Sequence, residues 1–170
     1  MEPARSLTGP EKLQQGLPMA ISNRVGNVSS SPEGVFVYGT LQQGEQREQN
    51  WPRTPRSRQC ATVRGTLFDL GAYPALLPGK DLIGGEFWEI AAADMPVTLQ
   101  VLDGIEGYNQ GHENLYERRV IFCRLETGIT VSAYTYFWAQ ANATHLLEKM
   151  TAGPDGVHLW RRGPGSHPTP

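Results

Sequence analysis

Two short segments of this chain combine residue types that could do acid–base chemistry on a small bound molecule. The first is Tyr38-Gly39-Thr40-Leu41, which ends an apolar, β-branched run over 35–37 that is typical of a buried strand. Gly39 has no Cβ, so the chain can turn there and a ligand can lie against bare backbone. The N–H groups released from the strand could then converge on one anion. The alternative is an ordinary strand end with a glycine turn.

The second segment covers residues 102–108, where Glu106 ends an expected helix between Gly104 and Gly107. A glycine on either side suggests that the backbone is shaped around the acid. A carboxylate at a helix C-terminus also faces the negative end of the helix dipole, which raises its pKa and makes it a better base. Glu106 is therefore the candidate general acid and base. The alternative is a solvated surface glutamate beside a glycine C-cap.

Three other acids compete with Glu106 for this role. Asp103 lies one helical turn earlier, near the same face. We expect its carboxylate to bond the backbone of the next turn instead. Glu86 and Glu89 lie in an expected strand, and their odd spacing points them to opposite faces. We expect Glu86 to face the interior.

The elements that must position these residues are mostly strands. Apolar and β-branched runs predict strands over 35–38, 61–70, 82–90, 116–125 and 129–138. The last two should form a hairpin. A turn and an extended piece are expected over 71–76, and Gly84-Gly85 marks a bulge or a close approach of backbone.

Few helices are expected. One covers 96–106, with Asp94 as its cap and Pro96 in its first turn. Another is a short helix over 143–150, and the Gln/Glu-rich stretch 42–50 should form one or two helical turns. Many short strands with few helices predict an α+β fold with a small, mostly antiparallel, curved or closed sheet.

Composition narrows the class of protein. With 170 residues, a net charge of −2 and a pI near 6.1, the chain suits one domain and has no strong field for nucleic acid or anionic lipid. No apolar stretch is long enough to span a bilayer, so we expect no membrane partner and a cytoplasmic location. Four arginines around Trp51 indicate a solvated face, with a minor alternative of RNA or protein binding. The oligomeric state stays open.

The histidines and cysteines do not indicate a metal or disulfide framework. The four histidines lack ligand spacing, so no metal site is expected. Cys60 and Cys123 lie in expected strands, where a buried thiol is the usual state. Residues 1–33, which end in Ser29-Ser30-Ser31-Pro32, form an expected flexible leader. The domain then covers 34–160, and 161–170 is an expected disordered tail.

Several motifs in order resemble the γ-glutamylcyclotransferase family, in its small γ-glutamylamine-cyclotransferase-like branch. They are VFVYGTL at 35–41, GTLFDLG at 65–71, YPAL at 73–76, GEFWEI at 85–90, LDGIEGY at 102–108, YERR at 116–119 and the strand that contains Tyr134. The resemblance implies a small β-barrel with flanking helices. It also implies release of 5-oxoproline and an amine from a small γ-glutamyl substrate, with no cofactor.

The same resemblance implies roles for individual residues. Glu106 would be the catalytic acid and base. The substrate would be bound by Tyr38, Gly39, Thr40, Leu41, Tyr73, Glu86, Tyr116 and Tyr134. Two alternatives from other classes stay open: a binding module without turnover, and a γ-glutamyl hydrolase or transferase that uses an external nucleophile. The leaving amine lies outside what these motifs specify.

Overall fold

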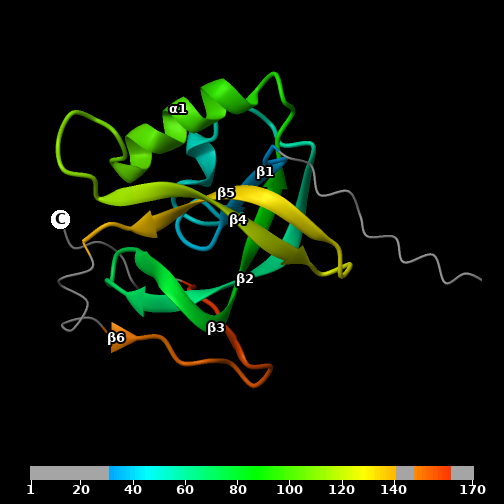
Figure 1. Cartoon of the computed structure of the whole chain (residues 1–170), viewed down its shortest axis with the longest axis vertical. Coiled ribbons are helices and arrows are strands. Elements are labelled where there is room, and N and C mark those ends of the chain that lie inside the picture. Colours follow the sequence, from blue (N-terminus) through cyan, green and yellow to red (C-terminus); the bar gives the residue numbers. More distant parts are fainter. Residues whose placement is uncertain (1–30, 141–147, 162–170) are drawn as a thin grey trace, which may run out of the picture.

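Five strands close into a barrel in this computed structural model, which describes residues 31–140 and 148–161 (Figure 1). The strands are β1 (Gly34–Val37), β2 (Ser57–Asp69), β3 (Pro74–Glu89), β4 (Tyr116–Leu125) and β5 (Thr130–Trp138). Their order is β2-β4-β5-β1-β3, and β3 pairs back with β2 to complete the ring. The pairings within the ring are antiparallel except for β1 with β5, which is parallel. The expected α+β fold with a closed sheet is confirmed.

β1 is a wall strand of the barrel that is buried along its whole length. All four of its residues are buried, because it pairs with β3 on one side and β5 on the other. Phe36 packs inside the barrel, whereas Val35 and Val37 pack on the opposite side in the core shared with the helix. A fully apolar strand is what burial of both faces requires. Tyr38 follows directly after β1, so its position is fixed by the pairing of β1 with both β3 and β5.

The helix α1 (Met95–Glu106) packs across the barrel through Leu102, which is fully buried. Pro96 lies in its first turn, as expected. Asp94 is the N-cap residue, as expected, but its side chain makes no cap hydrogen bond. The backbone of this residue is helical, and its carboxylate pairs with Arg53 at 3.4 Å instead. Gly107 ends the helix with a φ of 63°.

β3 differs most from the expected elements. The turn with an extended piece over 71–76 and the strand over 82–90 are joined in one strand of 16 residues. The register shift in the β2–β3 pair falls between Gly65 and Thr66, so no bulge lies at Gly84-Gly85. The other expectation for this pair, a close approach of backbone, is confirmed at Gly85. A Cβ on this residue would overlap the carbonyl oxygen of Val37.

Other expectations need smaller corrections. Residues 42–50 contain only the 3₁₀ turn η1 (Glu48–Asn50). Of the helix expected over 143–150, 143–147 lie outside the described residues, and Glu148–Lys149 form β6 on the edge of β2. A last strand, β7 (Val157–His158), pairs with β3.

The two cysteines differ in burial. Cys123 is fully buried, and burial raises the pKa of its thiol to about 12. Cys60 is exposed, so the expectation of a buried thiol there is wrong. The reason is strand alternation, which buries the next residue, Ala61, in its place.

Two further points concern the whole chain. In the described residues, no helix combines the length and apolar character needed to cross a membrane. The leader and the tail remain predictions, because residues 1–30 and 162–170 lie outside the described part of the chain.

Candidate active site

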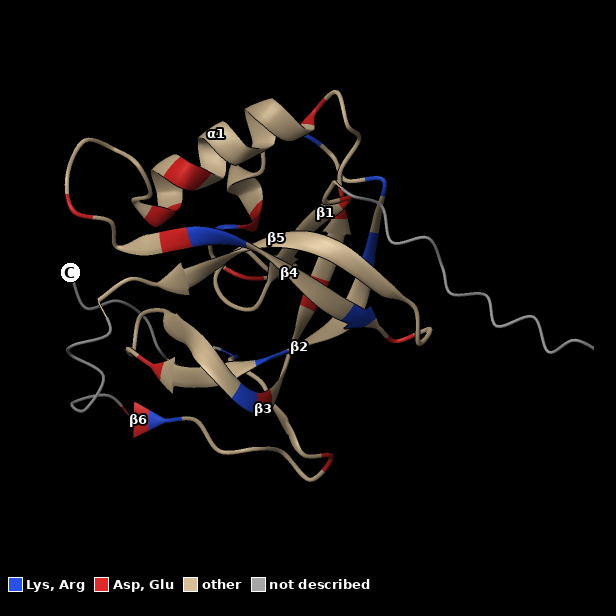
Figure 2. Ribbon diagram, in the orientation of Figure 1, with Lys and Arg blue, Asp and Glu red and all other residues tan. Residues whose placement is uncertain are grey.

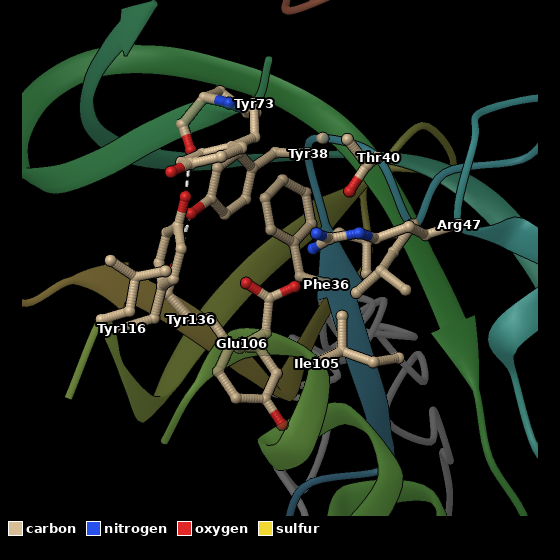
Figure 3. Close-up of a pocket in the computed structure, with 14 residues that line it drawn as sticks. Phe36, Tyr38, Thr40, Arg47, Tyr73, Ile105, Glu106, Tyr116 and Tyr136 are labelled. Atoms are coloured by element: carbon tan, nitrogen blue, oxygen red, sulfur yellow. Dashed lines mark hydrogen bonds between the residues drawn. The ribbon is translucent and has the colours of Figure 1, made fainter. Parts of the chain in front are cut away.

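A small pocket lies at one end of the barrel, where the chain leaves β1 and meets the C-terminal end of α1 (Figure 3). Its volume is about 60 Å³, so it suits part of a small molecule rather than a macromolecule. Seven of the residues expected from the sequence line it: Tyr38, Gly39, Thr40, Leu41, Tyr73, Glu106 and Tyr116. The structure thus brings the two motifs, which are more than sixty residues apart in the sequence, to one cavity.

The loop after β1 leaves its amides unused. The carbonyls of Gly39, Thr40 and Leu41 all accept hydrogen bonds from within the loop, at 3.0, 2.8 and 3.0 Å. Between described residues, none of the three N–H groups donates a hydrogen bond. A segment with satisfied carbonyls and free amides can bind an anion through its backbone. Gly39 is required here, because a Cβ would lie 2.8 Å from the ring of Pro74.

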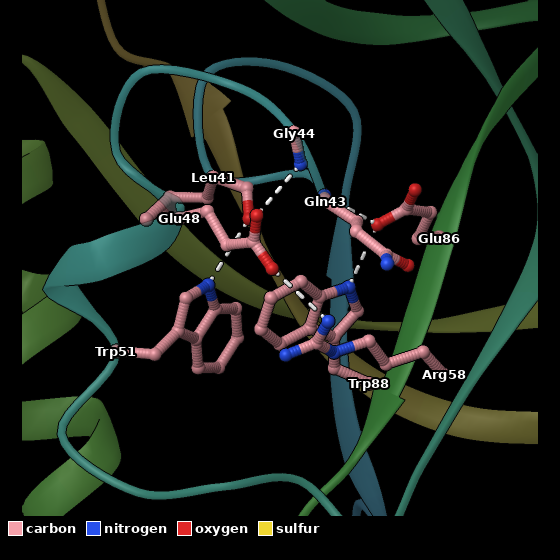
Figure 4. Close-up of polar contacts among 8 residues, drawn as sticks. All are labelled: Leu41, Gln43, Gly44, Glu48, Trp51, Arg58, Glu86 and Trp88. Atoms are coloured by element: carbon pink, nitrogen blue, oxygen red, sulfur yellow. Dashed lines mark hydrogen bonds and ion pairs between the residues drawn. The ribbon is translucent and has the colours of Figure 1, made fainter.

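Two acids outside the pocket hold this loop in shape (Figure 4). Glu86 Oε2 accepts hydrogen bonds from the backbone N–H of Gln43 and from Trp88 Nε1, both at 2.9 Å. Glu48 Oε2 accepts from the backbone N–H of Gly44 at 2.7 Å. Glu86 does not line the pocket, so the expectation that it binds substrate is not supported. Its place on β3 turns it toward the far side of the loop, which it supports.

Aromatic contacts complete this support. Trp51 donates from Nε1 to the carbonyl of Leu41 at 3.0 Å and stacks on Trp88 at a centroid distance of 4.2 Å. Arg58 lies over the Trp88 ring and pairs with Glu48 at 3.0 Å. These contacts tie the loop to β2 and β3. The loop is therefore preorganised in the absence of a ligand.

Glu106 is the ionisable group at the centre of the pocket. Burial raises the pKa of its carboxyl to about 7, and the positive charge of Arg47 opposes this rise. In the described part of the chain, the carboxylate accepts no hydrogen bond and forms no ion pair. The direction agrees with the sequence expectation, but the main cause is burial rather than the helix dipole. A carboxyl group with a pKa near 7 can both accept and return a proton at neutral pH.

The pocket tyrosines are neutral donors. Tyr38 donates from its hydroxyl to the carbonyl of Tyr136 at 2.6 Å, and Tyr116 donates to the carbonyl of Pro74 at 2.7 Å. Burial raises the pKa of both hydroxyls, and the nearby Glu106 raises it further. Neither tyrosine therefore competes with Glu106 as a base. Tyr73 packs edge-on against Tyr116.

Asp103 plays a different part from the one expected. Its carboxylate was expected to bond the local backbone, but Oδ1 accepts from the Tyr136 hydroxyl at 2.8 Å and Oδ2 pairs with Arg118 at 2.6 Å. The expectation fails because this face of α1 lies on β4 and β5, which offer charged partners. Figure 2 shows acidic segments at this end of α1 beside a basic segment of β4. Asp103 does not line the pocket.

Tyr134 is not part of the pocket either. The Arg118 guanidinium lies over its ring at 5.4 Å, and it is absent from the pocket lining. Tyr136, two residues further along β5 and on the same side of the strand, lines the pocket instead. The sequence motif thus identified the right strand but the wrong tyrosine.

Sequence reasoning missed two polar or charged pocket residues, Tyr136 and Arg47. Arg47 lies in the stretch that was interpreted only as helical turns. One signal was present: it is the single basic residue between Tyr38 and Pro52. Within 31–140 and 148–161, no group of three or more His, Cys, Asp or Glu side chains could hold a metal ion.

Comparisons with known proteins find a family and several proteins that this chain resembles. The model of a family described as gamma-glutamyl cyclotransferase, AIG2-like, matches residues 35–156. The gamma-L-glutamyl-butirosin B gamma-glutamyl cyclotransferase of Niallia circulans is 33% identical over 108 residues, which is 61% of this chain. The matched part spans 65% of that relative's length, just under two thirds.

Similar solved structures include one that supports the fold. The solution structure of a protein from Arabidopsis thaliana is similar to this chain, with 26% sequence identity and a TM-score of 0.51. The match covers 78% of each chain. YkqA from Bacillus subtilis is 24% identical with a TM-score of 0.49, over 64% of this chain and 36% of that protein.

Proposed function

Because the chain belongs to the AIG2-like gamma-glutamyl cyclotransferase family, we propose that it releases 5-oxoproline and an amine from a γ-glutamyl amine or peptide. The observation that carries the proposal is the position of Glu106. A buried carboxyl group with a pKa of about 7 lines the same small cavity as three backbone amides that donate no hydrogen bond to any described residue. One side of the cavity offers a proton acceptor and the other offers donors for an oxyanion.

The reaction is an intramolecular aminolysis. The α-amine of the γ-glutamyl group attacks its own γ-carbonyl carbon, and a C–N bond forms that closes a five-membered ring. The C–N bond to the leaving amine then breaks, and water is neither consumed nor released. Because the nucleophile is tethered, holding the glutamyl chain folded supplies an effective molarity on the order of 10⁵ M or more.

Glu106 moves the proton in this mechanism. The α-amine is largely protonated near neutral pH, so it must lose a proton before or during attack. Glu106 accepts a proton from the attacking nitrogen and donates it to the leaving nitrogen. The second proton that the ammonium group loses is taken up by the released amine, which is protonated near neutral pH, so the enzyme returns to its starting state. Such acid–base catalysis contributes about 10²–10⁴-fold. A pKa of about 7 suits both steps, since neither transfer is strongly uphill.

The amides of Gly39, Thr40 and Leu41 stabilise the oxyanion. Attack on the γ-carbonyl places a negative charge on its oxygen, and this charge needs donors that are already oriented. The carbonyls of these residues are tied into the loop, so the amides stay available without rearrangement. One such donor contributes roughly 3 kcal/mol to stabilising the transition state.

A direct test measures 5-oxoproline release from a panel of γ-glutamyl amines, γ-glutamyl dipeptides and glutathione. We expect the wild type to release 5-oxoproline from at least one of them and Glu106→Gln to lose 10²-fold or more of this rate. The matched control is Glu113→Gln, an exposed acid on the loop after α1.

The products separate the alternatives. Release of free glutamate would indicate a hydrolase, and a new γ-glutamyl adduct would indicate a transferase. Binding of 5-oxoproline without turnover on any substrate would indicate a binding module. A Glu106→Gln variant with the full wild-type rate would remove Glu106 from the mechanism.

A further inference from the structure

We propose that Arg47 binds the α-carboxylate of the γ-glutamyl substrate, and that it thereby restricts the site to substrates whose α-carboxylate is free. The inference rests on the proposed cyclotransferase function and adds to it a specificity-determining residue that neither the motifs nor the comparisons identify. It is carried by the place of Arg47 in the pocket, by its lack of a partner and by the chemistry of the substrate's α-carbon.

Arg47 is held at the pocket by its own backbone. Its N–H donates to the carbonyl of Thr40 at 2.8 Å, and its carbonyl accepts from the N–H of Asn50 at 3.0 Å. The residue therefore sits on the preorganised loop rather than on a free surface. Figure 3 shows its guanidinium beside the ring of Phe36, turned toward the carboxylate of Glu106.

The guanidinium has no close counter-ion. Arg58, Arg118 and Arg119 each pair with a carboxylate at 3.0 Å or less. By contrast, the Arg47 side chain forms no ion pair or hydrogen bond with any described residue, although it lies at least partly out of solvent. A partly buried cation that lacks a partner is unfavourable unless a ligand supplies the anion.

Glu106 does not serve as that counter-ion. Its interaction with Arg47 only opposes the rise in pKa that burial causes, and no contact joins the two side chains. Both side chains therefore line the same pocket without forming a closed ion pair with each other. A closed Arg47–Glu106 pair would have left neither group available.

The substrate requires this combination of charges. The α-carbon of a γ-glutamyl group carries both the amine that attacks and the carboxylate that remains on the product. A base that reaches the amine and a cation that reaches the carboxylate must therefore be neighbours. A guanidinium can hold a carboxylate through two parallel N–H···O hydrogen bonds, which fixes its orientation as well as its position. With these groups at Glu106 and Arg47, the γ-carbonyl is left for the loop amides.

Binding measurements test the proposal without relying on turnover. The probes are 5-oxoproline, which carries the carboxylate, and 5-oxoprolinamide, which replaces it with a neutral amide. We expect the wild type to bind 5-oxoproline about 10–100-fold more tightly by titration calorimetry. Arg47→Gln should bind both probes equally weakly, and Arg47→Lys should retain part of the preference. Arg56→Gln, which changes an exposed arginine outside the pocket, should behave as the wild type.

Kinetics add a second readout. For a γ-glutamyl amine, Arg47→Gln should raise KM about 10–100-fold, and the matching substrate with an α-carboxamide should be poor for both proteins. An unchanged melting temperature shows that the variant is folded. If Arg47→Gln kept the preference for 5-oxoproline, or if the wild type showed none, the proposal would be overturned while the cyclotransferase function stood. If no substrate were turned over but the Arg47-dependent preference for 5-oxoproline persisted, the proposed cyclotransferase function would be contradicted and the carboxylate site would be supported.

Discussion

The Tyr136 hydroxyl donates a hydrogen bond of 2.8 Å to the carboxylate of Asp103, one helical turn before the acid at the centre of the pocket. Arg118 pairs with the other oxygen of the same carboxylate at 2.6 Å. The last turn of α1 is thus fastened to both strands of the β4–β5 hairpin. Glu106 has no hydrogen bond of its own between described residues, so its position depends on this attachment of the helix.

Removing the Tyr136 hydroxyl should separate this positioning role from simple packing. In Tyr136→Phe the ring remains, but a hydrogen bond to a charged group is lost, which should lower the free energy of unfolding by about 1.5–3 kcal/mol. We expect kcat to fall with little change in KM, because Glu106 is displaced while the loop is intact. Denaturant unfolding and steady-state kinetics measure the two effects. Tyr134→Phe is the matched control on the same strand, and an equal loss of kcat in that variant would contradict the argument.

The pH dependence of activity should follow the ionisation of Glu106. Since burial raises its pKa to about 7, the carboxylate that accepts the proton becomes populated as the pH rises through about 7. We expect kcat/KM to rise through this range when measured between pH 5.5 and 8.5. In Arg47→Gln the midpoint should move to higher pH, because the positive charge that opposes the rise is gone. A kcat/KM that stays flat across this range would show that no group with a pKa near 7 is the titrating base.

The same group should make stability depend on pH. The pKa of Glu106 rises from its ordinary value of 4.5 to about 7 on folding, so between these values the folded chain binds more protons than the unfolded chain. Stability from this group is therefore fully present below pH 4.5 and is lost as the pH rises through about 7. At about 1.4 kcal/mol per unit of pKa, the loss is on the order of 3 kcal/mol.

Replacing Glu106 with a neutral glutamine should remove this loss of stability at high pH. We expect Glu106→Gln to be more stable than the wild type at pH 8, by up to about 3 kcal/mol, and nearly equal to it at pH 5. Urea unfolding at the two pH values provides the measurement, with Glu113→Gln as the reference for loss of an exposed charge. Equal effects of Glu106→Gln at both pH values would argue against a buried, raised-pKa carboxyl group.

The two glycines that flank Glu106 should respond in opposite ways to alanine. A Cβ on Gly104 would meet no atom within 4 Å, so Gly104→Ala should stabilise the protein by about 1 kcal/mol through helix propensity and leave activity unchanged. Gly107 has a φ of 63°, so Gly107→Ala should destabilise it by about 1–2 kcal/mol. Thermal unfolding of both variants tests this. A loss of activity in Gly104→Ala would show that the first glycine does shape the site.

The elements that sequence reasoning predicted well are those in which local signals agree. The β4–β5 hairpin was predicted to within a residue, because alternation on both strands and the turn Glu126-Thr127-Gly128 favour the same structure. The helix was predicted over 96–106 and is observed over Met95–Glu106. The fusion of 74–89 into one strand escaped prediction, since it depends on pairing with β2 across the bulge at Gly65/Thr66.

The same distinction applies to the candidate site. Gly39 and Glu106 could be placed at the pocket because their neighbours in the sequence constrain the backbone around them. Glu86 was misplaced because the side of a closed barrel that a residue faces depends on strand register and curvature rather than on its neighbours. Tyr134 lies on the same side of β5 as Tyr136, and only the folded structure shows that Tyr136 is the one at the pocket. Arg47 carried only one local signal, its being the single basic residue between Tyr38 and Pro52. Its importance became visible only once the loop was folded against α1.

The parallel pairing of β1 with β5 has a consequence for biosynthesis. Thr135 Oγ1 on β5 donates to the carbonyl of Phe36 on β1, a contact that spans 99 positions of the chain. At about 5–20 residues per second, the ribosome needs roughly 5–20 seconds to make the strand that completes the surroundings of β1. Until then, the loop that follows β1 has no barrel to hold it. A nascent chain halted before the β4–β5 hairpin would already contain both motifs and still be inactive.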